Sequence, residues 1–141
     1  MAMTAVALLW AGLAYNLSRP ADYQAYHRSV LQVAESAHDA TQSGRLIAEQ
    51  QLAGRVTTAF ARTAFDDAGQ ALAGAQKKFA AQGPPDSRSA ALRDRLGPLL
   101  AAAVTALGDT SQANDDSTLR TGAAELDALA QQLDDFITAH Q

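Results

Sequence analysis

The chain has 141 residues, a length typical of one domain, and 33 of them are Ala while only 6% are aromatic. Small apolar side chains in such excess favour closely packed helices over sheets, which are rich in β-branched and aromatic residues. The net charge is −4 and Arg is scattered among Asp, so the concentrated basic face typical of nucleic-acid binding is missing. The chain has no Cys, which excludes disulfides, thiolate metal sites and a cysteine nucleophile.

Residues 1–18 form an apolar segment that is distinct from the rest of the chain. It carries no charged side chain, and the first charge is Arg19. As a helix, the run 4–17 would span about 21 Å, which is shorter than a hydrocarbon core of roughly 30 Å. We expect a truncated membrane anchor or uncleaved signal helix, and two alternatives remain: a buried first helix of a soluble bundle and a cleaved signal peptide. The membrane-anchor candidates are Val6, Leu8, Leu9, Trp10, Leu13, Tyr15 and Leu17.

Residues 19–141 read as four amphipathic helices, and the first is expected from Ser18 or Pro20 to about Gln42. Ser18 is a candidate N-cap, and proline is common in the first turn of a helix. Apolar residues recur at spacings of three and four, which places them on one face. Ser43-Gly44 predicts a break. The face comprises Tyr23, Tyr26, Val30, Val33, Ala37 and Ala40.

The second helix is expected over about 45–82, with a bulky stripe beside a seam of small residues. Phe65, Leu72 and Phe79 recur every seven residues. Three glycines inside this range, at positions 54, 69 and 74, each cost about 1 kcal/mol against Ala. We expect close contact with another helix to compensate for them. The small-residue seam comprises Ala64, Ala68, Ala71 and Ala75.

Gly83-Pro84-Pro85-Asp86 is the clearest punctuation in the chain, because the prolines stop one helix and Asp86 can cap the next. The third helix is expected over about 87–107, and Gly97-Pro98 should kink it or split it. Because a kink opens the packing of a bundle, this is also a reasonable place for a ligand pocket. A polar loop over 108–114 follows. The expected apolar face of the third helix comprises Leu92, Leu96, Leu99, Ala103 and Ala106.

The fourth helix is expected to begin with Asp115 or Asp116 as its cap. Three polar connections between four amphipathic helices predict an all-α, antiparallel up-down four-helix bundle over 19–141. Its first helix could also continue from the apolar segment. In such a bundle both chain ends lie at the same pole. The apolar face of the fourth helix comprises Leu119, Leu126, Leu129, Leu133 and Phe136.

The most site-like polar cluster is Glu35, His38 and Asp39. Glu-x-x-His is the half-motif of di-iron carboxylate bundles, in which residues i and i+3 project together into the core. That chemistry needs a second such motif and further Glu, but the chain has only three Glu and none of the others has a His three residues later. A solvated polar face is therefore the favoured interpretation. We expect no metal, no cofactor and no catalytic residue.

These observations favour a non-enzymatic, bacterial helical bundle, tethered to the cell membrane by its N-terminus on the extracytoplasmic side and acting through contacts with another protein. The layout resembles the periplasmic four-helix sensor domains of bacterial chemoreceptors and histidine kinases, which implies a ligand-sensing input domain as an alternative. A soluble cytoplasmic bundle is the third hypothesis. The sequence leaves the partner and the oligomeric state open.

Overall fold

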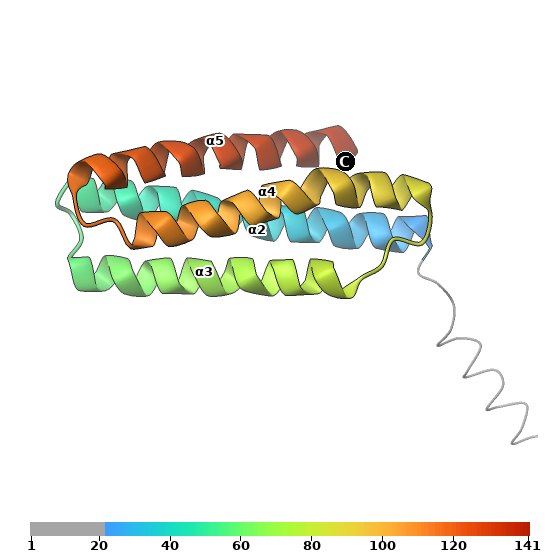
Figure 1. Ribbon diagram of the computed structural model, residues 1–141, viewed down its shortest axis with the longest axis horizontal. Helices are drawn as coiled ribbons and strands as arrows, with labels where there is room; N and C mark the ends of the chain where they lie inside the picture. Colours follow the sequence, from blue (N-terminus) through green and yellow to red (C-terminus); the bar gives the residue numbers. More distant parts are fainter. Residues whose placement is uncertain (1–21) are drawn as a thin grey trace, which may run out of the picture.

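The computed structural model describes residues 22–141, which form four antiparallel helices and contain no strand (Figure 1). The expected all-α four-helix bundle is confirmed over this range. The helices are α2 (Tyr23–Leu52), α3 (Thr58–Ala81), α4 (Ser87–Ser111) and α5 (Asp116–His140). None of these helices is long and apolar enough to cross a membrane.

Each helix begins directly after a side chain that caps it. Asp22, Asp86 and Asp115 accept hydrogen bonds at 2.7–2.8 Å from backbone N–H groups three residues later. Thr57 caps α3 in the same way at 3.1 Å. The caps expected at residues 86 and 115 are therefore confirmed, whereas the first described helix begins at Tyr23, after the expected start at residues 18–20.

The break expected at Ser43-Gly44 is wrong, because α2 continues through it to Leu52. Gly44 is buried, and a Cβ at this position would overlap Leu107 Cδ1 and stand 3.3 Å from Leu126 Cδ1. The glycine thus allows α2 to approach α4 and α5 closely. The turn lies instead at 53–57, where Gly54 adopts a positive φ of 68° that favours glycine over other residues.

Of the kink or split expected at Gly97-Pro98, the split is wrong, since α4 is one helix with Pro98 inside it. Proline removes the hydrogen bond that would reach the carbonyl of Asp94. Both Pro98 and Asp94 are exposed, so water can hydrate the freed carbonyl group.

The bundle has a rhombic cross-section. α2 lies close to all three other helices, including α4 across the bundle, whereas no Cα atom of α3 comes within 8 Å of a Cα atom of α5. The close passage of α2 and α4 at Gly44 explains this shape, because one short diagonal forces the other pair of helices apart. α3 consequently rests on two neighbours.

The expected apolar faces form the core, with a few shifts. Tyr26, Val33, Leu72, Leu126 and Leu133 are among its most buried members. Tyr23, Leu99 and Leu129 are only partly buried, and Leu100 takes the buried position on α4. The small-residue seam of α3 is half confirmed: two of its members are buried, and Ala71 is exposed.

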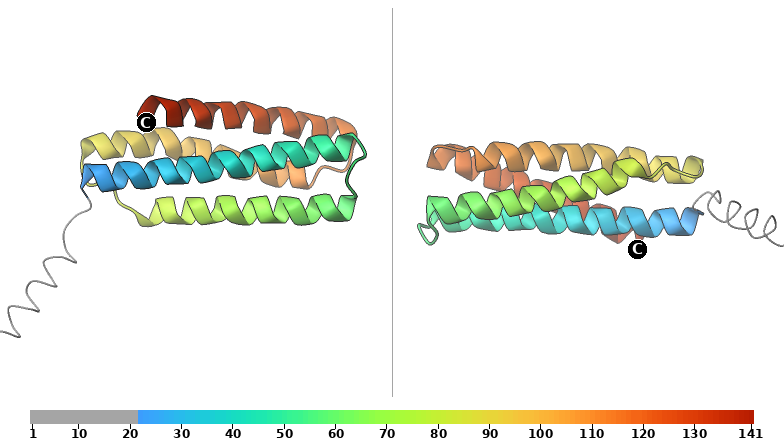
Figure 2. Two further views of the ribbon diagram at one scale, coloured as in Figure 1. Left: turned by 180° about the vertical axis from the view of Figure 1, so that it is seen from behind. Right: turned by 90° about the horizontal axis from the view of Figure 1, so that it is seen from below.

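The two ends of the bundle differ in what they carry. α2 begins and α5 ends toward the same end, as the three views in Figures 1 and 2 show, and this proximal end also holds the connection 82–86. The opposite, distal end holds the connections 53–57 and 112–115. The chain that precedes residue 22 therefore joins the bundle at the proximal end.

Candidate functional site

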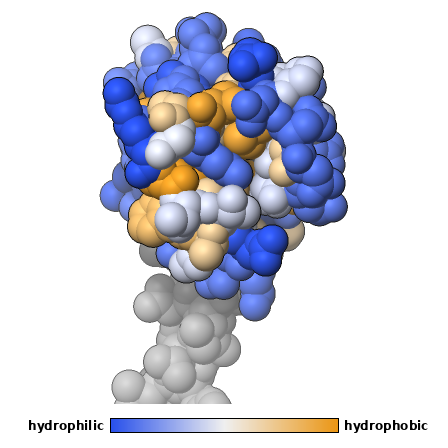
Figure 3. All heavy atoms as spheres, turned by 90° about the vertical axis from the view of Figure 1, so that its left-hand side faces the viewer, coloured by the Kyte–Doolittle hydropathy of each residue, from blue (hydrophilic) through white to orange (hydrophobic). Residues whose placement is uncertain are grey.

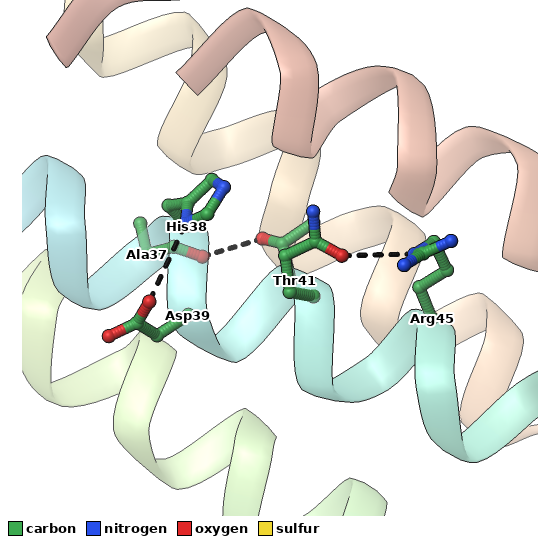
Figure 4. Close-up of polar contacts among 6 residues, drawn as sticks. Ala37, His38, Asp39, Thr41 and Arg45 are labelled. Carbon is green, nitrogen blue, oxygen red and sulfur yellow. Dashed lines mark hydrogen bonds and ion pairs between the residues drawn. The ribbon is translucent and has the colours of Figure 1, made fainter. Parts of the chain in front are cut away.

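The polar cluster on α2 lies at the surface of the bundle. His38 Nδ1 lies 3.5 Å from Asp39 Oδ1, and the Asp39 side chain is 84% exposed (Figure 4). Glu35 is exposed. Within residues 22–141 no group of three His, Cys, Asp or Glu is placed to hold a metal ion. The cluster is a solvated part of the α2 surface.

The membrane-anchor candidates lie outside the described residues, at positions 6–17. Of the tyrosines next to that segment, Tyr26 belongs to the core and is 2% exposed. Tyr23 is partly buried, and the guanidinium carbon of Arg88 stands 4.0 Å from the centre of its ring. The proximal end thus presents an aromatic ring covered by a cation.

A polar cavity of about 550 Å³ opens at the distal end, between the start of α3 and the α4–α5 connection. A separate hollow of about 480 Å³ between α4 and α5 is lined by Arg95 and Leu99, beside the Gly97-Pro98 position where a pocket was expected. The buried Phe65 lines the polar cavity, and Arg62 and Asp116 contribute opposite charges. Its remaining lining residues are Gln51, Thr58, Ala61, Ser111, Gln112, Ala113, Asn114, Asp115 and Leu119.

The carboxylate of Asp115 is already engaged where it borders this cavity. It accepts hydrogen bonds from the backbone N–H and the hydroxyl of Thr118, both at 2.8 Å. These bonds, the backbone one first, hold the pKa of Asp115 below its ordinary value of 3.8. Asp115 therefore acts as a helix cap and stays ionised at neutral pH.

An apolar groove of about 380 Å³ continues from this cavity along the junction of α3 and α4. The two share Phe65 and Ser111. Asp66 is the one charged side chain that lines the groove, among residues 22–141. The remaining lining residues are Gly69, Gln70, Leu72, Ala73, Val104, Leu107 and Gly108.

Large apolar side chains reach the surface in the distal half of the bundle. Leu46, Phe60 and Val104 are 48%, 60% and 38% exposed, and each lies nearer the distal than the proximal end of its helix. The end-on view in Figure 3 also shows apolar surface, in orange, between polar side chains at the distal end. The partly buried Leu52 and Val56 belong to this region.

Charge is distributed unevenly along the bundle. The distal half, residues 38–69 and 100–127, holds four Arg and nine Asp or Glu. The proximal half, residues 22–37, 70–99 and 128–141, holds six Lys or Arg and six Asp or Glu. The distal half is therefore strongly acidic and the proximal half neutral.

Sequence reasoning missed the groove and the exposed apolar side chains beside it. The periodicity of α3 identifies its buried stripe, but it does not show which face of α3 is left uncovered by the other helices. Glycine inside a helix was the one sequence signal, but it does not locate the groove, because Gly69 and Gly108 line it and Gly74 does not. The close helix contact expected at Gly69 and Gly74 is wrong, because a Cβ at either position would meet nothing within 4 Å.

Comparison of the chain with family models, curated proteins and solved structures finds no match.

Proposed function

We propose that this protein is a non-enzymatic helical bundle, tethered to the cell membrane by residues 1–18 on the extracytoplasmic side, that binds another protein with its distal half. One observation carries the proposal: the chain enters the bundle at the proximal end, while the groove, the exposed apolar side chains and the excess acid lie toward the distal end. A tether at one end leaves the other end free to meet a partner.

The composition of the two ends supports this orientation. The segment before Arg19 is uncharged and mostly apolar, as expected of chain that enters a membrane interface. The neutral proximal half would approach anionic lipid headgroups without repulsion, whereas the acidic distal half would be held away from them. Tyr23 beneath Arg88 has the aromatic and cationic character common at such interfaces.

The test uses the absence of Cys. Single Cys residues replace the exposed Ser87 at the proximal end or the exposed Ser117 at the distal end, and intact native cells are treated with a membrane-impermeant maleimide. We expect both variants to react before lysis and the protein to sediment with membranes. A third variant, Ala37→Cys, is the control because residue 37 is fully buried, and it should react only after denaturation.

Labelling only after lysis would refute the extracytoplasmic placement and favour the soluble cytoplasmic bundle. Recovery of the unlabelled chain in the soluble fraction would refute the tether as well.

The polar cavity favours one second candidate, a ligand-sensing input domain. Arg62 and Asp116 line it with opposite charges, and within residues 22–141 Arg62 forms no ion pair. A small polar ligand that stabilises the fold should raise the melting temperature of the chain, and Arg62→Ala should abolish that rise. Arg120→Ala is the matched control, because Arg120 is exposed outside the cavity. Equal responses of the two variants would contradict a ligand site at Arg62.

A further inference from the structure

Three glycines lie in helices of this bundle without a conformational or packing reason of their own: Gly69 and Gly74 in α3, and Gly108 in α4. None of the three has a positive φ, and a Cβ at any of these positions would meet nothing within 4 Å. Each costs about 1 kcal/mol against Ala in a helix interior. Gly44 and Gly122, by contrast, stand directly against side chains of neighbouring helices.

Two of these three glycines, Gly69 and Gly108, line the groove at the α3–α4 junction, and Gly74 lies outside it. The two that line it belong to one helix each, so together they leave its two walls without side chains at these positions. Leu72 and Leu107 are buried beside them, and Val104 is 38% exposed at the same groove. The groove is thus an apolar hollow kept open by the absence of two side chains.

The dimensions suit a helix. Along α3 the groove extends from Phe65 to Ala73, about 12 Å at 1.5 Å per residue, or just over two helical turns. An amphipathic helix places apolar side chains at i, i+4 and i+7 into such a groove.

The charge around the groove indicates which kind of helix would bind there. Asp66 lines the groove, no Lys or Arg does so among residues 22–141, and the surrounding distal half is acidic. A second copy of the chain would bring its own negative charge to this surface. The segment 1–18 has no cation to pair with Asp66.

We infer that the α3–α4 groove binds an amphipathic helix of another protein, one whose apolar face is flanked by Lys or Arg. This inference rests on the proposed function and names its binding site and the chemistry of the partner.

The probe is a peptide of about 15 residues, long enough to form a helix on binding, with Leu at i, i+4, i+7 and i+11 and with Lys and Ala elsewhere. It is titrated into the ¹⁵N-labelled full chain in nanodiscs of zwitterionic lipid. We expect saturable shifts of the Gly69 and Gly108 amide resonances. The control peptide has Glu in place of every Lys, and should bind at least about tenfold more weakly, a difference of about 1.4 kcal/mol.

Matched variants test the groove itself. Gly69→Leu places a side chain in it and should weaken binding about tenfold or more, whereas Gly74→Leu makes the same change on the same helix outside it. Likewise Asp66→Lys should weaken binding several-fold, while the neighbouring Asp67→Lys, outside the groove, should not. Thermal unfolding of each variant shows that it is folded, and Gly69→Ala replaces Gly69→Leu if the larger residue unfolds the chain.

Three results would overturn the inference: equal affinity of the Lys and Glu peptides, unshifted Gly69 and Gly108 amides, or a dimer in light scattering that Gly69→Leu dissociates. The last would assign the groove to a second copy of the chain. The maleimide test is independent of these results. If the maleimide labels the protein in intact cells but the peptide does not bind, the groove is not the binding site and the extracytoplasmic tether stands. If the peptide binds but the protein is not labelled in intact cells, the binding site stands and the extracytoplasmic tether is refuted.

Discussion

Gly122 of α5 lies directly against Thr110 of α4, so that a Cβ at position 122 would stand 2.9 Å from Thr110 Cβ. Thr110 is buried, and its hydroxyl donates to the carbonyl of Ala106 at 2.6 Å. A β-branched side chain held by such a bond has little freedom to move aside. The approach of α4 and α5 at this level therefore depends on a glycine.

Gly122→Ala should destabilise the protein. The added methyl group forces α4 and α5 apart at a cost of about 1–3 kcal/mol, which exceeds the gain of about 1 kcal/mol from the better helix propensity of Ala. Urea unfolding should show a lower midpoint than that of the wild-type chain. Thr110→Ala in the same chain should restore part of the loss, and an unchanged midpoint in Gly122→Ala alone would contradict the contact.

Gly69→Ala and Gly74→Ala should have the opposite effect. A Cβ at either position meets open space, so the gain in helix propensity, up to about 1 kcal/mol per site, is not offset by a clash. Both variants should unfold at higher urea concentration than the wild-type chain. A lower midpoint for Gly69→Ala would mean that the groove is narrower than the structure shows.

Tyr26→Phe should leave the stability equal or raise it. The Tyr26 side chain is 2% exposed, and its hydroxyl finds no hydrogen-bond partner within residues 22–141. Burying a hydroxyl without a partner costs free energy, and Phe has the same shape without it. The melting temperature is the measurement. Tyr23→Phe, at a partly exposed ring, serves as the control, and a clear drop confined to Tyr26→Phe would contradict the interpretation.

Acid should weaken the starts of α4 and α5. The pKa values of Asp86 and Asp115 lie below 3.8 in the folded chain, chiefly because the backbone N–H groups of Ser89 and Thr118 donate to them. A lowered folded pKa stabilises the fold above the unfolded pKa, and this contribution disappears as the pH falls through the folded value. Stability should therefore decline as the pH drops below about 4.

Asn at both positions is the matched variant for this prediction. Asn caps helices about as well as Asp but does not titrate, so the double variant should lose less stability than the wild-type chain between about pH 4 and pH 2. Identical acid transitions of the two chains would show that other carboxylates dominate the decline.

Much of the fold could be predicted from local sequence. The caps at Asp86 and Asp115 and the stripe of Phe65, Leu72 and Phe79 depend on spacings within one helix and its border, and the structure confirms them. Such features need no knowledge of the neighbouring helices.

Gly44 and Gly54 show where local reasoning stops. Both are glycines near the junction of two apolar patterns, yet one sits inside α2 and the other in the turn that follows it. The difference is that Leu107, 63 positions after Gly44 in the chain, packs directly against Gly44 and against no other glycine near this junction. The groove escaped prediction for the same reason, since it depends on how α3 packs against α4, which lies later in the chain.

α3 is buried on two sides only, between connections that contain Gly54 at one end and two prolines at the other. A helix held in this way has fewer interactions to lose than α2, so its amide hydrogens should exchange with solvent before those of the rest of the bundle. A bound partner would cover part of its remaining surface. Binding in the groove would then slow the exchange of the α3 amide hydrogens. Because α3 is the least buried helix, the stability of the bundle would rise when the partner is bound.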